Sequence, residues 1–279
     1  MRPLRRSRYR GFTLIEVIIV ILLLATLAIY SFGFLGLGSD MVIQVNQRNQ
    51  LVAEQRFAIE RLTREIRSSV PRSARANAAC LEYMPLIGSN VYLTLPRPGP
   101  GGNEPMVVVT PLIQLGDMVG NYVLVYATGP DYIYGNNQQR RKLITAVSND
   151  APQNGLSTLS LSATPAEFFT DSPDRTYYIG GSPVSWCLDS ANQTLVRFAN
   201  YGLLMNQPDF SSLSVAATSQ EVMAVDVVND LSLGQQPFQA MAPTLQRNNL
   251  VRILLAFNSS EPAAPAIEII HEVYIPNVP

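Results

Sequence analysis

The chain has few of the side chains that carry most nucleophilic and metal chemistry. It contains one histidine, His271, and two cysteines, Cys80 and Cys187. Catalysis with a histidine base and zinc sites built from several His or Cys ligands are therefore poorly supported. Asp226 and Asp230 lie close in sequence but lack the dense oxygen ligands of a calcium loop. We predict that the protein is not an enzyme, has no catalytic residues and holds no metal or cofactor; His271 is expected to be structural.

Charge is also scarce, and it is unevenly placed. Charged residues make up 15% of the 279 residues, below the roughly 25% usual for soluble domains. Five of the 20 basic residues stand in the first ten positions: Arg2, Arg5, Arg6, Arg8 and Arg10. The rest of the chain has an excess of acidic side chains. A basic tip on an acidic body disfavours nucleic acid as a partner, and we predict none.

A long apolar run follows the basic tip. No charged side chain occurs between Val17 and Ser39, a stretch long enough to cross a bilayer, which needs about 20 residues. The arginines place the N-terminus in the cytoplasm and the rest of the chain on the far side. A secretory signal or a plain anchor could also give such a run. However, a secretory signal is cut after a shorter apolar core, whereas the small residue Gly11 precedes this run. A plain anchor leaves Glu16 unexplained.

Glu16 is the one charged residue between Phe12 and Ser39. A carboxylate inside a membrane helix costs on the order of 2.5–3.5 kcal/mol, and such residues are functional by default. It stands four residues after Phe12, so both lie near the first turn of one helix. An interfacial glutamate that reaches the headgroups, or that accepts from helix amides, would occupy the same position. Position alone leaves both interpretations open.

The residues around Glu16 resemble the processing site of type IV prepilins. The motif runs from Arg10 to Val17 and reads Arg-Gly-Phe-Thr-Leu-Ile-Glu-Val. The resemblance implies cleavage after Gly11, N-methylation of the new terminus at Phe12, and a docking role for Glu16 toward a neighbouring subunit's amino terminus. The implied partners are prepilin peptidase, other minor and major pilins, the inner-membrane assembly platform and membrane lipid. One departure is Gly33, where many major pilins carry a proline.

The helix is predicted to continue beyond the membrane, as one element from Phe12 to Val70 that ends before Pro71. Apolar residues recur at three- and four-residue steps, at Leu51, Ala58, Ile59, Leu62, Ile66 and Val70. The remaining positions carry Arg56, Glu60, Arg61, Arg64, Glu65 and Arg67. We expect the apolar stripe to pack on a core and the charges to form a solvated face.

After Pro71 the sequence changes to short apolar or alternating runs between turn residues, which predicts antiparallel β-structure. The expected strands are 80–87, 92–95, 106–113, 122–128, 142–147, 158–161, 176–179, 184–188, 194–198, 222–228, 251–257 and 267–275. Turns are expected at 189–192 and 258–265, loops at 96–102 and 232–249, and an exposed basic turn at 140–142. The predicted fold class is α+β: a pilin-like long N-terminal helix, half membrane and half amphipathic, packed on antiparallel sheet.

Both cysteines fall in predicted strands on the far side of the membrane, an oxidising compartment. We therefore expect a Cys80–Cys187 disulfide rather than two buried thiols. The predicted organisation is a basic leader at 1–11, a transmembrane part at 12–38, an amphipathic helical half at 39–71, and a periplasmic β-rich domain at 72–279.

Further segments are similar to the MshO family of minor pilins from the mannose-sensitive haemagglutinin (MSHA) pilus: residues 55–67, 80–85, 184–187 and 271–279. The layout also resembles J-type pseudopilins of type II secretion and PilW-like minor pilins. The resemblance implies a structural subunit that starts or caps a pilus. It would sit in the bacterial inner membrane by a single pass, N-terminus in the cytoplasm and body in the periplasm, and then at the pilus tip. Two alternatives remain: a J-type pseudopilin, or a membrane-anchored periplasmic binding protein or enzyme with an accidental motif.

Overall fold

The computed structural model describes residues 11, 13–99, 105–135, 139–151, 155–162, 167–241, 249–258 and 266–275. The chain forms two compact units, residues 1–53 and 54–279. Helix α1, Leu14–Arg67, begins in the first unit and ends in the second. The predicted N-terminal helix is therefore confirmed, and the antiparallel sheets described below confirm the α+β class.

The first part of α1 is apolar apart from Glu16. Residues Leu14–Ser31 are long and apolar enough to cross a membrane, and none of this stretch is buried within the chain. An amphipathic helix would have a polar face toward water, and this stretch has none. Its apolar side chains therefore need lipid or other helices as their surroundings.

Helix α1 ends three residues earlier than predicted because the chain turns to pair with a later strand region. The Ser69 hydroxyl donates to the Ile66 carbonyl at 2.6 Å, which satisfies one of the last helical acceptors. The next backbone N–H, of Val70, donates to the Met84 carbonyl at 2.8 Å. Pro71 thus follows a helix that has already ended.

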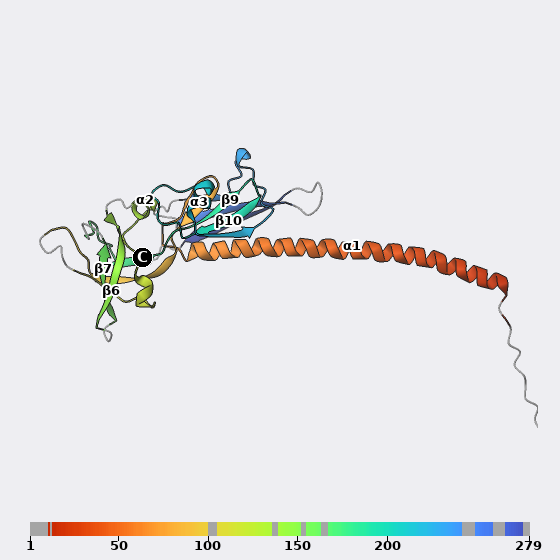
Figure 1. Ribbon diagram of the computed structural model, residues 1–279, viewed down its shortest axis with the longest axis horizontal. Coiled ribbons are helices and arrows are strands. Elements are labelled where there is room, and N and C mark those ends of the chain that lie inside the picture. Colours follow the sequence, from red (N-terminus) through yellow and green to blue (C-terminus); the bar gives the residue numbers. More distant parts are fainter. Residues whose placement is uncertain are drawn as a thin grey trace, which may run out of the picture. The chain divides into compact units, whose positions relative to one another are not determined.

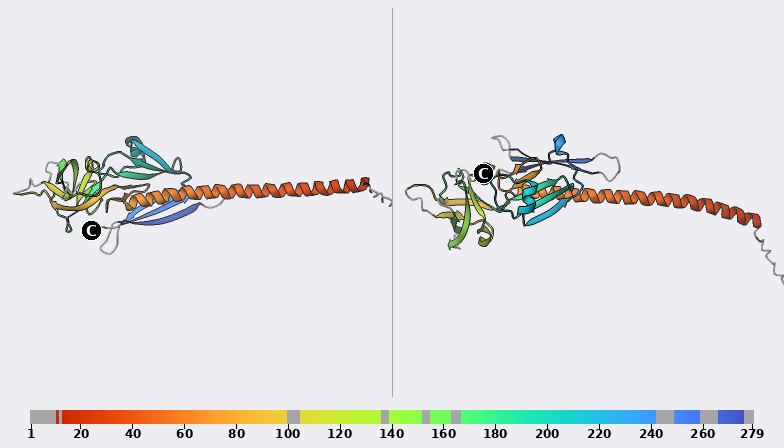
Figure 2. Two further views of the ribbon diagram at one scale, coloured as in Figure 1. Left: turned by 90° about the horizontal axis from the view of Figure 1, so that it is seen from below. Right: turned by 45° about the horizontal axis from the view of Figure 1, so that its top comes forward.

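In the second unit, the last turns of α1 lie between two antiparallel sheets (Figure 2). The five-stranded sheet has the order β1-β2-β9-β10-β11. Its strands are β1 Arg75–Ala76, β2 Cys80–Tyr83, β9 Val184–Asp189, β10 Thr194–Ala199 and β11 Ser219–Ala224. The three-stranded sheet consists of β12 Phe238–Met241, β13 Asn249–Phe257 and β14 Ile267–Ile275, in that order. Leu62 and Ile66 of α1 are fully buried in the core that these sheets share, which confirms the predicted apolar stripe.

A closed six-stranded barrel lies between β2 and β9 in the sequence and forms its own core (Figure 1). The strand order is β3-β4-β7-β6-β5-β8. The strands are β3 Leu86–Thr94, β4 Met106–Val109, β5 Tyr122–Val125, β6 Arg141–Ala151, β7 Leu156–Ser162 and β8 Thr176–Gly180. Short helices η1 Leu115–Met118 and α2 Pro130–Ile133 belong to its connections, and α3 Phe210–Ala216 and η3 Leu231–Leu233 lie later in the chain. The barrel was not among the sequence predictions.

Most predicted strands are present, although the predicted strands 106–113 and 122–128 end earlier, at Val109 and Val125, and β1 was not predicted. Three further differences have a structural reason. The predicted strand 80–87 is two strands, because Pro85 pairs with Ser69 and sends β2 and β3 into different sheets. The predicted loop 232–249 contains β12, which pairs with β13. Strand β11 ends at Ala224, before the end predicted at 228, since Asp226 has a φ of 57° and cannot continue an extended strand. The predicted turn at 189–192 does join β9 to β10; most of 258–265 lies outside the described residues.

Candidate functional site

The N-terminal segment places Glu16 in the first turn of α1. The Thr13 carbonyl accepts hydrogen bonds from the backbone N–H groups of Glu16 at 3.1 Å and Val17 at 3.3 Å. A carboxylate there is favoured by the unpaired amides of the helix N-terminus. Gly11 is exposed, and a Cβ built on it would meet no atom within 4 Å. Phe12 and the arginine-rich residues 1–10 lie outside the described residues.

The carboxylate of Glu16 has apolar neighbours along its own helix. Ile15 is 63% exposed and Ile19 is 50% exposed. The helix thus presents one acidic side chain on an otherwise apolar surface. In a bilayer such a group needs a partner of opposite charge or contact with the interface.

The α1 face of the five-stranded sheet holds a half-buried charged group, here called the Glu65 cluster. It joins α1 to four strands through Arg61, Glu65, Tyr83, Trp186, Arg197 and Glu221. Glu65 accepts from Arg61 Nε at 3.1 Å, Arg197 Nε at 3.1 Å, Trp186 Nε1 at 3.2 Å and the Tyr83 hydroxyl. Arg61 also contacts Glu221 at 2.8 Å. The prediction that the charges after the membrane all form a solvated face is therefore wrong for Arg61 and Glu65.

The hydrogen bonds decide the protonation of Glu65. Burial acts to raise its pKa, but the bonds from Tyr83 and Arg197 outweigh burial and hold the pKa below its usual value. Burial, together with the charge of Glu65, raises the pKa of the Tyr83 phenol. The cluster is thus a carboxylate shared among donors from β2, β9 and β10, and it fixes the rotation of α1 on the sheet.

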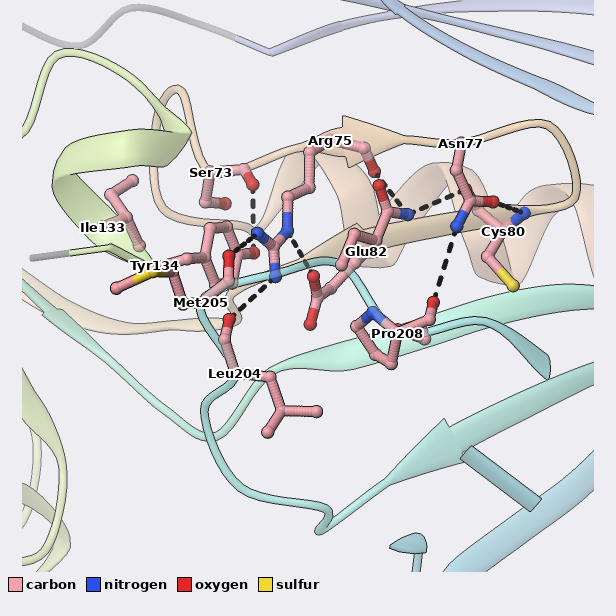
Figure 3. Close-up of polar contacts among 12 residues, drawn as sticks. Ser73, Arg75, Asn77, Cys80, Glu82, Ile133, Tyr134, Leu204, Met205 and Pro208 are labelled. Carbon is pink, nitrogen blue, oxygen red and sulfur yellow. Dashed lines mark hydrogen bonds and ion pairs between the residues drawn. The ribbon is translucent and has the colours of Figure 1, made fainter. Parts of the chain in front are cut away.

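The opposite face of the same sheet carries the Arg75 cluster, drawn in Figure 3. Arg75 pairs with Glu82, which is fully buried. Its guanidinium donates to the carbonyls of Met205 at 2.6 Å and Leu204 at 2.9 Å, and lies 3.7 Å from the centroid of the Tyr134 ring. These contacts tie β1 and β2 to the loop after β10 and to the residue that follows α2 in the barrel.

Glu82 is held deep within this arrangement. The Tyr201 hydroxyl donates to Glu82 at 2.9 Å, and the Tyr134 hydroxyl donates to the Ser73 carbonyl at 3.0 Å. Burial raises the pKa of Glu82, although Arg75 and Tyr201 act to lower it. Because the carboxylate has no exposed surface, it cannot reach a substrate. The cluster serves as a joint between the barrel and the sheet.

The predicted disulfide is present beside the Arg75 cluster. Cys80 and Cys187 are bonded, and they occupy directly paired positions on β2 and β9. Both are buried on the sheet face away from α1, against Phe198 and Leu213.

The basic run at 140–142 is not the exposed turn that its charges predict. Arg140 is 7% exposed and Lys142 is 2% exposed, and β6 begins at Arg141. The guanidinium of Arg140 lies 4.0 Å from the Tyr132 ring centroid, and that of Arg141 lies 5.3 Å from the Tyr122 ring centroid. Cations on aromatic faces are favourable when shielded from water. The tyrosines shortly before the run were the sequence signal for this burial.

The other candidate residues show no metal arrangement. Over the described ranges, no group of three or more His, Cys, Asp and Glu side chains could hold a metal ion. His271 lines a groove together with Ile59 and Thr63 of α1.

Residues 6–32 match the family described as the prokaryotic N-terminal methylation motif. No curated protein and no solved structure gave a match to the chain. The matched residues include the predicted cleavage pair Gly11 and Phe12, and Glu16. The motif supports a type IV pilin-like or pseudopilin-like protein with an N-terminal helix suited to a membrane anchor, and it implies processing by a prepilin peptidase and partners of the pilin type.

Proposed function

We propose that the chain is a minor pilin, a structural subunit and not an enzyme, that starts or caps a type IV pilus of the MSHA type. One observation carries the proposal: the methylation motif at residues 6–32 includes the start of a helix whose residues Leu14–Ser31 are long and apolar enough to cross a membrane. A soluble enzyme has no use for such a helix, whereas a filament built from membrane-stored subunits needs one. The resemblance of residues 55–67, 80–85, 184–187 and 271–279 to the MshO family supports the MSHA subtype.

The subunit would be stored in the inner membrane before assembly. Helix α1 would cross the bilayer from a cytoplasmic N-terminus, as the five leading arginines favour. The body would then stand in the periplasm, where the Cys80–Cys187 bond is chemically stable. On assembly it would move into the pilus, at the tip.

Glu16 would act as the docking residue between subunits. Cleavage after Gly11 would leave a cationic amine on Phe12, four residues before Glu16. Each mature subunit would then carry one charge of each sign at nearly the same depth. An axial stagger would set Glu16 beside a neighbour's amine, where opposite charges attract strongly in a low-dielectric setting. Like charges would oppose wrong registers.

The test replaces Glu16 in the full chain, in the source bacterium deleted for the gene. Glu16→Ala should be processed after Gly11 but should give fewer pili and weaker cross-linking to other minor pilins. Glu60→Ala, a change of an exposed α1 glutamate outside the apolar stretch, is the matched control and should leave piliation unchanged. Normal piliation with Glu16→Ala would overturn the docking role.

The deletion itself tests the subtype. Loss of pili with intact protein secretion is expected for an MSHA-type minor pilin. Loss of secretion with intact pili would replace the proposal by a J-type pseudopilin. If both persist and the chain stays in the membrane, an anchored binding protein is the better account.

A further inference from the structure

The barrel carries a pocket that plays no part in the clusters described above. Its volume is about 310 Å³. Three segments that are distant in sequence line it: the loop after α1, the end of β5 and the loop leading into β8. The polar and aromatic lining residues are Arg72, Tyr126, Thr128, Ser172, Asp174, Thr176 and Tyr178.

Two of the lining residues adopt a backbone conformation that side chains disfavour. Tyr126 has a φ of 51° and Arg72 has a φ of 66°. Arg175, the neighbour of the lining residue Asp174, has a φ of 53°. Non-glycine residues in this left-handed region are strained, and such strain gathers at ligand-binding positions. Three of the non-glycine residues with positive φ thus lie in or beside this pocket.

The ring of Tyr126 contacts a buried cation. Tyr126 is 39% exposed, whereas Arg140 is 7% exposed. Arg140 Nη1 donates to the Tyr126 carbonyl at 2.8 Å and to Thr128 Oγ1 at 3.2 Å. Its guanidinium lies 5.1 Å from the Tyr126 ring centroid and 4.0 Å from that of Tyr132. An exposed aromatic ring supported in this way is prepared to stack on a ligand.

The part of the lining that leads into β8 is fixed by hydrogen bonds around Ser172. The backbone N–H of Ser172 donates to the Tyr92 hydroxyl at 3.0 Å. The backbone N–H of Arg175 donates to the Ser172 carbonyl at 3.0 Å, and that of Thr176 donates to Ser172 Oγ at 3.2 Å. These hydrogen bonds fix the backbone of residues 172–176, most of which line the pocket.

The charges in the pocket balance. Burial is the main cause that raises the pKa of Tyr178; the charge of Asp174 adds to this rise and that of Arg72 opposes it. One guanidinium and one carboxylate thus act on the same phenol. A ligand of either sign would be attracted by one group and repelled by the other, so a neutral ligand is favoured.

We propose that this pocket binds the ring of a neutral saccharide. A sugar ring offers an apolar C–H face to the Tyr126 ring, and hydroxyls that both donate and accept toward Arg72, Asp174 and the Thr128 hydroxyl. The volume is at the low end of ligand pockets, which suits one ring rather than a nucleotide or a long chain. The proposal does not depend on pilus assembly.

The test is a titration of the full chain in a detergent without a sugar headgroup. D-glucose, D-galactose and N-acetyl-D-glucosamine are the neutral probes, and D-glucosamine and D-glucuronate are the charged comparators. Binding is followed by calorimetry and by saturation-transfer NMR. We expect at least one neutral sugar to bind more tightly than both charged sugars. Absence of binding by all three neutral sugars, or preference for a charged one, would overturn the proposal.

Three variants locate the site. Glycine accommodates the positive φ at this position, so Tyr126→Gly should keep the fold while affinity falls tenfold or more. Asp174→Asn should also weaken binding. Tyr274→Ala removes another exposed tyrosine, 53% exposed on β14, and should bind normally. Unchanged affinity in Tyr126→Gly would overturn the assignment.

Discussion

Cys80 and Cys187 face each other as directly paired residues of β2 and β9, with their Cα atoms 4.1 Å apart, and the whole barrel lies in the 107-residue separation between them. The chain leaves the five-stranded sheet after β2, forms the barrel, and returns through β9. The disulfide therefore closes the base of the insertion. The Arg75 cluster lies on the same face of the sheet as the disulfide. It adds a second connection between the barrel and the sheet, through the contact of Arg75 with Tyr134.

Removing the disulfide should destabilise the body. Replacing both Cys80 and Cys187 with alanine should lower the free energy of unfolding by about 2–4 kcal/mol, since the bond closes a long loop in the unfolded chain. Urea denaturation of the detergent-solubilised chain measures this change, and reduction of the unchanged chain serves as the control. If the chains with and without the disulfide unfold at the same urea midpoint, the disulfide does not stabilise the body. The Arg75 cluster alone would then stabilise the base of the barrel insertion.

Glu65 and Glu82 should give opposite pH dependences of stability. Their ordinary pKa is 4.5. Burial acts to raise the pKa of Glu65, but hydrogen bonds lower it overall, so its stabilising contribution is present above pH 4.5 and is lost as the pH falls through the lowered pKa. Burial raises the pKa of Glu82, so its contribution is present below pH 4.5 and is lost as the pH rises through the raised pKa.

Two glutamine variants separate these effects in unfolding curves measured on both sides of pH 4.5. Glu65→Gln should flatten the loss of stability on the acid side. Glu82→Gln should flatten the decline on the alkaline side, even though it leaves Arg75 without its carboxylate and lowers stability at every pH. The quantity to compare is the slope of the unfolding free energy against pH. If this slope is unchanged in both variants, the predicted pH dependence is wrong.

The packing of α1 predicts a contrast between two of its apolar residues. Leu62 is fully buried between the two sheets, whereas Phe57 is 58% exposed. Leu62→Ala should lower the free energy of unfolding by about 2–5 kcal/mol, because it leaves a cavity in a shared core. Phe57→Ala should change it by roughly 0.5 kcal/mol or less. Similar losses for both variants in urea denaturation would mean that the helix is rotated from the position described.

The sequence was sufficient to predict what depends on local pattern. The three- and four-residue spacing of apolar residues predicted that Leu62 and Ile66 would be buried. Short apolar or alternating runs predicted most strands. The disulfide between Cys80 and Cys187 was predictable because the body is expected in an oxidising compartment and because two cysteines can form one bond. The prepilin-like motif could be recognised from the sequence because its residues are contiguous.

Features that depend on distant residues were not predictable. Barrel closure depends on pairings such as β3 with β8, which are far apart in the chain. Glu65 is half buried because Trp186 and Arg197 reach it from β9 and β10. Arg140 is buried against the rings of Tyr126 and Tyr132, and the fold, not the charge of residues 140–142, decides that contact. The pocket beside Tyr126 draws on three such distant segments.

The mass of the mature N-terminal peptide tests the central claim most directly. We expect mass spectrometry of the chain recovered from sheared filaments to find a peptide that begins at Phe12 and carries one added methyl group. Gly11→Trp should block the cut and leave the precursor intact in the membrane. Recovery of peptides containing Met1 or Arg2 from assembled filaments would contradict the claim that this chain is a processed pilin-type subunit.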